Sequence, residues 1–159
     1  MADTVTVGWG APKIGLKKAG ETEIKFFATP VEGTTTLEAS QGDKMEAKIE
    51  GGTNEAVKYK ANTYTLTFDV RQVPERTDPV EGLDGVVEGE YMVIIYPEND
   101  SAIHAVLKRT VINIQEKFDA ENGLVRTYTF DVLKPSDGSA QVVLGTKAEV
   151  ETLAGVKTE

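Results

Sequence analysis

Few residues in this chain are of the types that carry out catalysis. The 159 residues include no cysteine and a single histidine, His104, which excludes a thiol nucleophile, a cysteine–zinc site and a multi-histidine metal site within one copy. Ser101 precedes His104 by three residues, but the sequence holds no Gly-x-Ser-x-Gly turn of the kind that presents a nucleophilic serine. We interpret His104 as a partly exposed structural residue and predict that the protein is not an enzyme.

Carboxylates occur in two close pairs, Glu98 with Asp100 and Asp119 with Glu121. Acid–base catalysis would need neighbouring carboxyl groups with different pKa values, and calcium would need the ligand spacing of an EF-hand, which is absent. Such pairs are expected by chance in a chain with 26 acidic residues. We therefore interpret these acids as solvated turn residues and predict no catalytic, cofactor-binding or metal-binding residues.

Glycines surround the only tryptophan near the N-terminus. Gly8-Trp9-Gly10 does not match the Gly-x-Gly-x-x-Gly pattern of a dinucleotide site, and no helical pattern follows that would bind phosphate. Trp9 has two interpretations: a ring that stacks on a ligand, or an anchor in a core or an interface. The sequence favours the anchor.

The overall charge limits the partners that the chain can bind. With 17 Lys and Arg against 26 Asp and Glu the net charge is −9, so nucleic acid and anionic membranes should be repelled. No apolar run approaches the ~18 residues of a membrane span, and Met1–Thr4 begin no secretory signal. We predict a soluble, acidic, single domain (1–159), with termini at 1–12 and 146–159 that are extended or depend on assembly.

Composition and hydrophobic pattern favour β-structure. Thr, Val and Ile supply 44 of the residues, and branching at Cβ suits a pleated sheet. Apolar residues alternate with polar ones in 64–70 and 128–132, as in half-buried strands. Residues 91–96 are apolar throughout, which predicts a central strand covered on both faces. Further strands are predicted at 5–9, 13–17, 24–28, 34–38, 43–50, 55–60, 110–118 and 141–145.

Turn signals separate these strands, and helical signals are weak. Asn122-Gly123 predicts a hairpin, because both residues tolerate positive φ. Residues 72–90 are either a linker or a loop that crosses between sheets, and the flanking strands favour the loop. Residues 98–108 form either a short helix or a direct lead into the next strand, and 147–153 is a second weak helix candidate. The predicted fold class is all-β, an antiparallel sandwich or partly closed barrel with one or two short helices.

Residues 46–60 are predicted to form a hairpin around Gly51-Gly52, with Lys and Glu alternating with apolar residues. An isolated two-stranded ribbon is marginal in water. A hairpin that projects from the body therefore needs a partner for Ile49, Val57 and Tyr59. We predict that these three residues contact a neighbouring subunit, and the alternative is that the hairpin folds back on its own sandwich.

The order of these pieces is similar to that of a known family. Between residues 34 and 145 the chain resembles the tail tube proteins of tailed bacteriophages and the related tubes of contractile injection systems. The resemblance implies a β-sandwich or barrel-like core with a flanking helix and a long hairpin, and stacked rings, usually hexameric, around a channel for DNA. It implies no catalytic residues. The segments that carry it are Gly42–Ala47, Tyr64–Val70, Gly82–Gly85, Tyr91–Glu98, Asn122-Gly123, Arg126–Pro135 and Asp137-Gly138.

Two functions from different classes follow from this sequence. The first is a structural tail tube subunit, made in the host cytoplasm and located in the virion, whose partners are its own copies, other tail proteins and DNA that passes without specific binding. An acidic wall would let DNA slide, and no cofactor or membrane is expected. The second is a non-catalytic β-sandwich module that binds carbohydrate or serves adhesion at the virion surface. An enzyme subunit or cryptic hydrolase ranks third, and we favour the first function.

Overall fold

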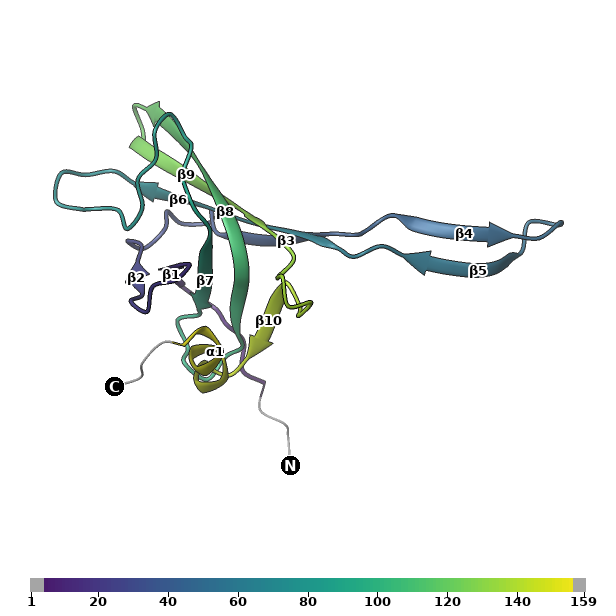
Figure 1. Cartoon of the computed structure of the whole chain (residues 1–159). Coiled ribbons are helices and arrows are strands. Elements are labelled where there is room, and N and C mark those ends of the chain that lie inside the picture. Colours follow the sequence, from purple (N-terminus) through teal and green to yellow (C-terminus); the bar gives the residue numbers. More distant parts are fainter. Residues whose placement is uncertain (1–4, 156–159) are drawn as a thin grey trace.

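The computed structural model describes residues 5–155, which form an antiparallel β-fold with one short helix (Figure 1). The predicted all-β class is confirmed. The strands and the helix are β1 (Lys13–Lys18), β2 (Lys25–Phe26), β3 (Thr36–Ser40), β4 (Lys44–Lys48), β5 (Asn54–Tyr59), β6 (Thr63–Arg71), β7 (Tyr91–Tyr96), β8 (His104–Asp119), β9 (Gly123–Val132), β10 (Val142–Gly145) and α1 (Lys147–Ala154).

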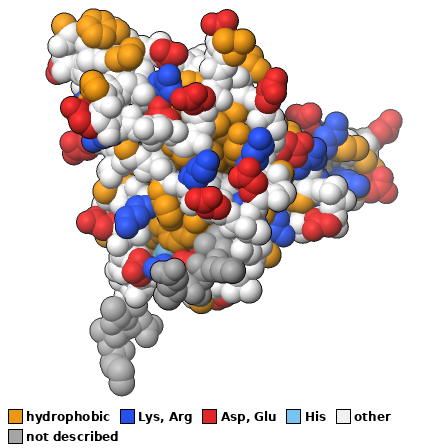
Figure 2. Space-filling model, turned by 60° about the vertical axis from the view of Figure 1, so that its left-hand side comes forward, with side chains coloured by type: hydrophobic (Ala, Val, Ile, Leu, Met, Phe, Trp, Pro, Cys, Tyr) orange, Lys and Arg blue, Asp and Glu red, His pale blue; other side chains and the backbone are white. Residues whose placement is uncertain are grey.

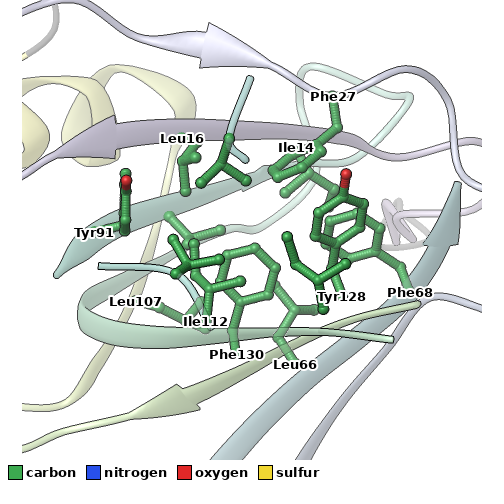
Figure 3. Packing of buried hydrophobic residues seen from close by; sticks show 14 of the residues in the cluster. Ile14, Leu16, Phe27, Leu66, Phe68, Tyr91, Leu107, Ile112, Tyr128 and Phe130 are labelled. Carbon is green, nitrogen blue, oxygen red and sulfur yellow. The ribbon is translucent and has the colours of Figure 1, made fainter. Parts of the chain in front are cut away.

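Eight of the strands belong to one sheet, in the order β2-β1-β7-β8-β9-β6-β3, with β10 also paired to β8. The long strand β8 joins two parts of this sheet. Near its start, Val106 lies opposite Ile94 of β7 and Val143 of β10, whereas from Thr110 onward it pairs with β9. One layer therefore contains β1, β7 and β10, the other contains β9, β6 and β3, and the core lies between them (Figure 3).

Aromatic rings fill this core. The ring of Phe27 meets the rings of Phe68 and Tyr128 edge-on, with centroids 5.0 and 4.8 Å apart. Phe68 also stacks on Phe130 at 5.6 Å. Leu66 and Phe68 of β6 and Tyr128 and Phe130 of β9 are fully buried, so the inward faces predicted from the alternation are confirmed.

The strand β7 is buried on both faces, as its continuous apolar pattern predicted. Val93 faces the main core, while Ile94 faces α1. Val150 and Ala154 of α1 pack against this second face, which explains why β7 needs no polar residues.

The helix α1 confirms the weak prediction at 147–153. Thr146 caps its N-terminus, because the Thr146 hydroxyl accepts a hydrogen bond from the Glu149 amide at 3.3 Å. Gly155 ends it with a φ of 72°, a left-handed conformation that glycine adopts without strain. The Lys17 ammonium donates to the carbonyl oxygen of Ala154 at 2.6 Å and fastens this end of the helix to β1.

One predicted strand is wrong, and one alternative is resolved. Residues 5–9 form no strand, because the segment pairs with no strand in the part of the chain that the structure describes, and Val5 and Trp9 are exposed. Residues 98–108 contain no helix and lead directly into β8. The helix was an alternative because Ile103, Val106 and Leu107 have the i, i+3, i+4 spacing of one helix face. In the structure Ile103 is exposed, whereas Val106 and Leu107 are buried on the two faces of β8.

Residues 72–90 lead from β6 in one layer to β7 in the other. Val80 and Val87 of this segment are buried in the main core. A tight turn at Asp84-Gly85, with φ angles of 51° and 85°, lies beside β8, where Val86 bridges to Asn113. The structure describes neither residues 1–4 nor residues 156–159. The prediction of extended or assembly-dependent termini falls partly on these residues. The prediction that Met1–Thr4 begin no secretory signal falls on them entirely.

Candidate assembly surface

The most distinctive feature of the molecule is an arm, defined here as residues 41–62, that projects far from the body (Figure 1). Its strands β4 and β5 form a separate two-stranded sheet that continues the β3–β6 pair outward. Gly51 and Gly52 make the turn at the tip, with φ angles of 93° and 84° that residues with a Cβ adopt only at a cost. The hairpin predicted at 46–60 is thus present, and in this structure it does not fold back on its own sandwich.

Every residue of β4 and β5 is exposed, and so is every residue of β3. About half of the residue surface remains in water at Met45, Ile49 and Tyr59, which are 51%, 50% and 51% exposed, and Val57 is 44% exposed. A two-stranded ribbon of this kind gains little from burial and is marginal by itself. The arm is therefore a surface without a covering partner in the single chain.

The strand register divides the arm into two faces. Partners in an antiparallel pair lie on the same face, and neighbours along a strand lie on opposite faces. Tyr59 lies opposite Lys44, and Val57 lies opposite Glu46. We call this side the tyrosine face.

The other side is the methionine face, on which Met45 lies opposite Lys58 and Ala47 lies opposite Ala56. Ile49 lies one residue past the end of β4, where its amide donates to the carbonyl oxygen of Thr53, and alternation from Ala47 assigns it to this face. The structure therefore places the three predicted assembly residues on two faces, Val57 and Tyr59 on one and Ile49 on the other. A single neighbour that covers one face would leave the other in water.

The two faces differ in how their charged side chains are paired. On the tyrosine face, Glu46 lies between Lys44 at 2.6 Å and Lys48 at 3.6 Å. The hydrogen bond from Lys44 lowers the pKa of the Glu46 carboxyl, and the same contact raises the pKa of the Lys44 ammonium. Exposed pairs of this kind contribute little to stability, and the one carboxylate of Glu46 offsets one of the two lysine charges. On the methionine face, Lys58 is the only charged residue among the register-paired positions.

The predicted catalytic candidates are not brought together. His104 is fully buried, so its interpretation as a partly exposed residue is wrong; it lies at the start of β8, and its ring meets Tyr96 edge-on at 5.4 Å. Its Nδ1 donates to the carbonyl oxygen of Ala102 at 2.8 Å, and its Nε2 has no hydrogen-bond partner within residues 5–155. Ser101 is exposed in the preceding turn, and no hydrogen bond joins it to the imidazole in that range.

Asp119 stabilises the turn between β8 and β9, as expected for a turn acid. Its carboxylate accepts hydrogen bonds from the amides of Glu121 at 3.0 Å and Asn122 at 2.6 Å, and the Asn122 amide is the main cause that lowers the pKa of Asp119. Across the described ranges no three His, Asp or Glu side chains gather as metal ligands would. Trp9 is 77% exposed, so it is not a core anchor.

A second surface, which the sequence did not predict, is a groove between α1, β2 and the end of β7. It has a volume of about 1070 Å³. The rings of Phe26 and Tyr96 lie 5.7 Å apart along it, and Phe26 is 48% exposed. Figure 2 brings this side of the body forward and shows hydrophobic side chains exposed in its lower half, with acidic and basic groups around them.

Acidic groups surround the aromatic part of the groove. Glu151 of α1 lines it and is only 6% exposed, and no ion pair to its carboxylate is found within residues 5–155. Burial, with a smaller contribution from Glu151, raises the pKa of Tyr96 to about 12. Glu98 accepts a hydrogen bond from the Ala11 amide at 3.2 Å, and Asp100 pairs with Lys147 at 3.7 Å. The groove is thus apolar in its centre and charged at its edge, with three carboxylates (Glu98, Asp100, Glu151) and two lysines (Lys13, Lys147).

No protein-family model matches this chain, and no curated protein is significantly similar to it. Within residues 5–155 no helix has the length and apolar character needed to cross a membrane.

Proposed function

We propose that this chain is a structural subunit that assembles with copies of itself into stacked rings, and that these rings form a phage tail tube through which DNA passes. The observation that carries the proposal is the arm, whose strand residues are all exposed while apolar side chains occupy both faces. A ribbon of this kind is stabilised when other surfaces cover it. Copies of the same chain are the partners that a ring would supply on both sides.

The charge of the sheet supports a passage for DNA. The outward face of β6 and β9 carries Thr65, Thr67, Thr127 and Thr129 with two carboxylates, Asp69 and Asp131. The Thr127 hydroxyl donates to Asp69 at 2.7 Å. Hydroxyl and carboxylate groups occupy the middle of this face, and its cations, Arg71 of β6 and Lys117 of β8, lie beyond them toward the β8–β9 turn. The middle of the face therefore offers phosphates no cation to bind. Together with the net charge of −9, this face is suited to a channel through which a polyanion moves without being held.

The remaining parts of the proposal rest on the resemblance to tail tube proteins. It implies about six copies in each ring, contacts with other tail proteins, and a place in the virion after synthesis in the host cytoplasm. None of these needs a cofactor or a catalytic residue.

The test is the assembly state of the purified protein. We expect rings or tubes in electron micrographs and a matching high mass in light scattering. Replacing Ile49 and Tyr59 together by Glu should leave a folded monomer, because both side chains are exposed in the single chain. The matched control, Ile49→Leu with Tyr59→Phe, keeps the apolar area and should still assemble. A wild-type protein that stays monomeric up to high micromolar concentration would overturn the proposal.

The second candidate, a carbohydrate-binding or adhesion module, is favoured by one observation. Trp9 is 77% exposed, and an exposed indole ring is a suitable surface for stacking on a sugar. Because Trp9 is the only tryptophan, its fluorescence reports directly on this site. A saturable change of that fluorescence with an oligosaccharide, in a protein that forms no rings, would favour this function over the first.

A further inference from the structure

We infer that the groove beside α1 receives the methionine face of the arm from a second copy of the chain, with Lys58 of that copy directed at the groove's carboxylates. This inference rests on the proposed self-assembly and identifies which two surfaces meet.

The first argument is complementary chemistry. The methionine face carries Met45, Ala47 and Ala56 around one cation, Lys58. The groove offers the converse, an apolar centre with Phe26 and Tyr96 and carboxylates at its edge. A lysine directed there would contact aromatic rings and carboxylates together, and both kinds of contact favour an ammonium group.

The second argument concerns which lysine is available. Lys44 and Lys48 of the tyrosine face already contact Glu46. Lys58 has no ion pair among residues 5–155, and its cross-strand neighbour is Met45 rather than an acid. On the groove side, the buried Glu151 also lacks an ion-pair partner over the same range. The groove lining also holds Lys13 and Lys147, so its three carboxylates exceed its cations by one, and Lys58 carries the opposite sign.

The third argument is position. The arm extends from one side of the body, and β2, which borders the groove, lies on the opposite side (Figure 1). An arm cannot reach the groove of its own body in this arrangement. Two different surfaces at opposite ends of one molecule give a head-to-tail contact, which forms a ring when the rotation between copies closes and a filament when it does not.

Charge reversal tests the pairing of the two surfaces. Lys58→Glu alone and Glu98→Lys alone should each weaken association, by roughly tenfold or more, whereas the chain that carries both changes should assemble again. Lys44→Glu combined with Glu98→Lys is the matched control, because Lys44 lies on the tyrosine face, and it should not restore assembly. Equal weakening by the double swap and by its control would overturn the inference.

Disulfide cross-linking gives an independent readout, and the absence of native cysteine makes it specific. A Met45→Cys chain mixed with a mass-tagged Ala148→Cys chain should form a mixed disulfide, because Ala148 lines the groove. Lys44→Cys, one residue away on the opposite face, should not. Rings without the Met45–Ala148 cross-link would refute this docking while leaving the proposed function intact. A wild-type protein that forms no rings would refute the function itself. A third sample is a chain that carries both Met45→Cys and Ala148→Cys, kept at nanomolar concentration so that copies rarely meet. A disulfide within that single chain would show that the arm contacts its own groove, and this would also overturn the inference.

Discussion

Removing the arm should abolish assembly while leaving the body at least as stable as before. The change that tests this is deletion of residues 43–60, which joins Gly42 to Ala61. Ser40 of β3 pairs with Thr63 of β6 at the base of the arm, so the deletion leaves a four-residue loop, residues 41, 42, 61 and 62, between two strands that stay paired. Hairpin loops of that length are common.

The expected change in the free energy of unfolding is small and positive. None of the deleted residues is buried, so no burial energy is lost from the core. The connection between Ser40 and Thr63 shortens from 22 residues to four, and for a flexible chain the loop-closure entropy favours the shorter one by about 1.5 kcal/mol. Because the native arm is partly ordered, that value is the upper limit of the gain. We therefore expect a gain between zero and about 1.5 kcal/mol.

Urea unfolding followed by circular dichroism measures this quantity, since Trp9 is too exposed for its fluorescence to report on the core. Light scattering and electron microscopy of the same sample report the assembly state. A loss of more than about 2 kcal/mol would mean that the arm belongs to the cooperative core, and rings formed without the arm would mean that it is not the assembly element. Either result would refute the reasoning.

Three further variants test the body and its helix. Phe68→Ala should cost about 3–5 kcal/mol, because its fully buried ring contacts three other aromatic rings, whereas Phe118→Ala, at a 74% exposed position, should change urea stability by less than about 0.5 kcal/mol. Burial raises the pKa of the Tyr128 hydroxyl, so the unfolded chain releases this proton at a lower pH than the folded chain does. The free energy of unfolding should therefore fall as the pH rises above about 10. In urea unfolding at a series of alkaline pH values, Tyr128→Phe should make this fall shallower, and an unchanged slope would contradict the reasoning. Thr146→Ala should lower the free energy of unfolding by about 1 kcal/mol, because the helix cap is lost. Thr146→Ser keeps the capping hydroxyl and should retain most of the stability in the same urea assay. Equal losses in the two variants would exclude a role for the cap.

Much of the body could be predicted from the sequence because burial there follows the alternation of side chains. Leu66, Phe68 and Val70 alternate with polar residues and are buried. β7 was predicted to be central from its apolar residues alone. The arm was also predictable as a hairpin, since Gly51-Gly52 separates two alternating runs.

The register, by contrast, could not be predicted, and it decides which residues act together. In the sequence Ile49 and Tyr59 belong to one apolar set, but Tyr59 pairs with Lys44, and alternation along β4 assigns Ile49 to the other face. A shift of one residue would exchange every side chain between the faces. His104 was misjudged because its burial depends on tertiary contacts, among them the edge-on contact with the ring of Tyr96. The groove was missed for the same reason, since its lining comes from four separate segments.

The arm and the body differ in the distance along the chain over which their strands pair. In the body, Lys13 of β1 lies opposite Tyr96 of β7, and closing so large a loop makes such a pairing slow. The arm pairs across a short turn, and hairpins of that kind form in about 1–10 μs. On a newly made chain the arm can therefore pair, transiently and with its edges open, before the body has closed. Lysines along both of its strands and the irregular register beside Lys48 disfavour pairing with other arms during this interval. The edges of the arm therefore need protection against pairing with other arms during the interval in which the body has not yet closed.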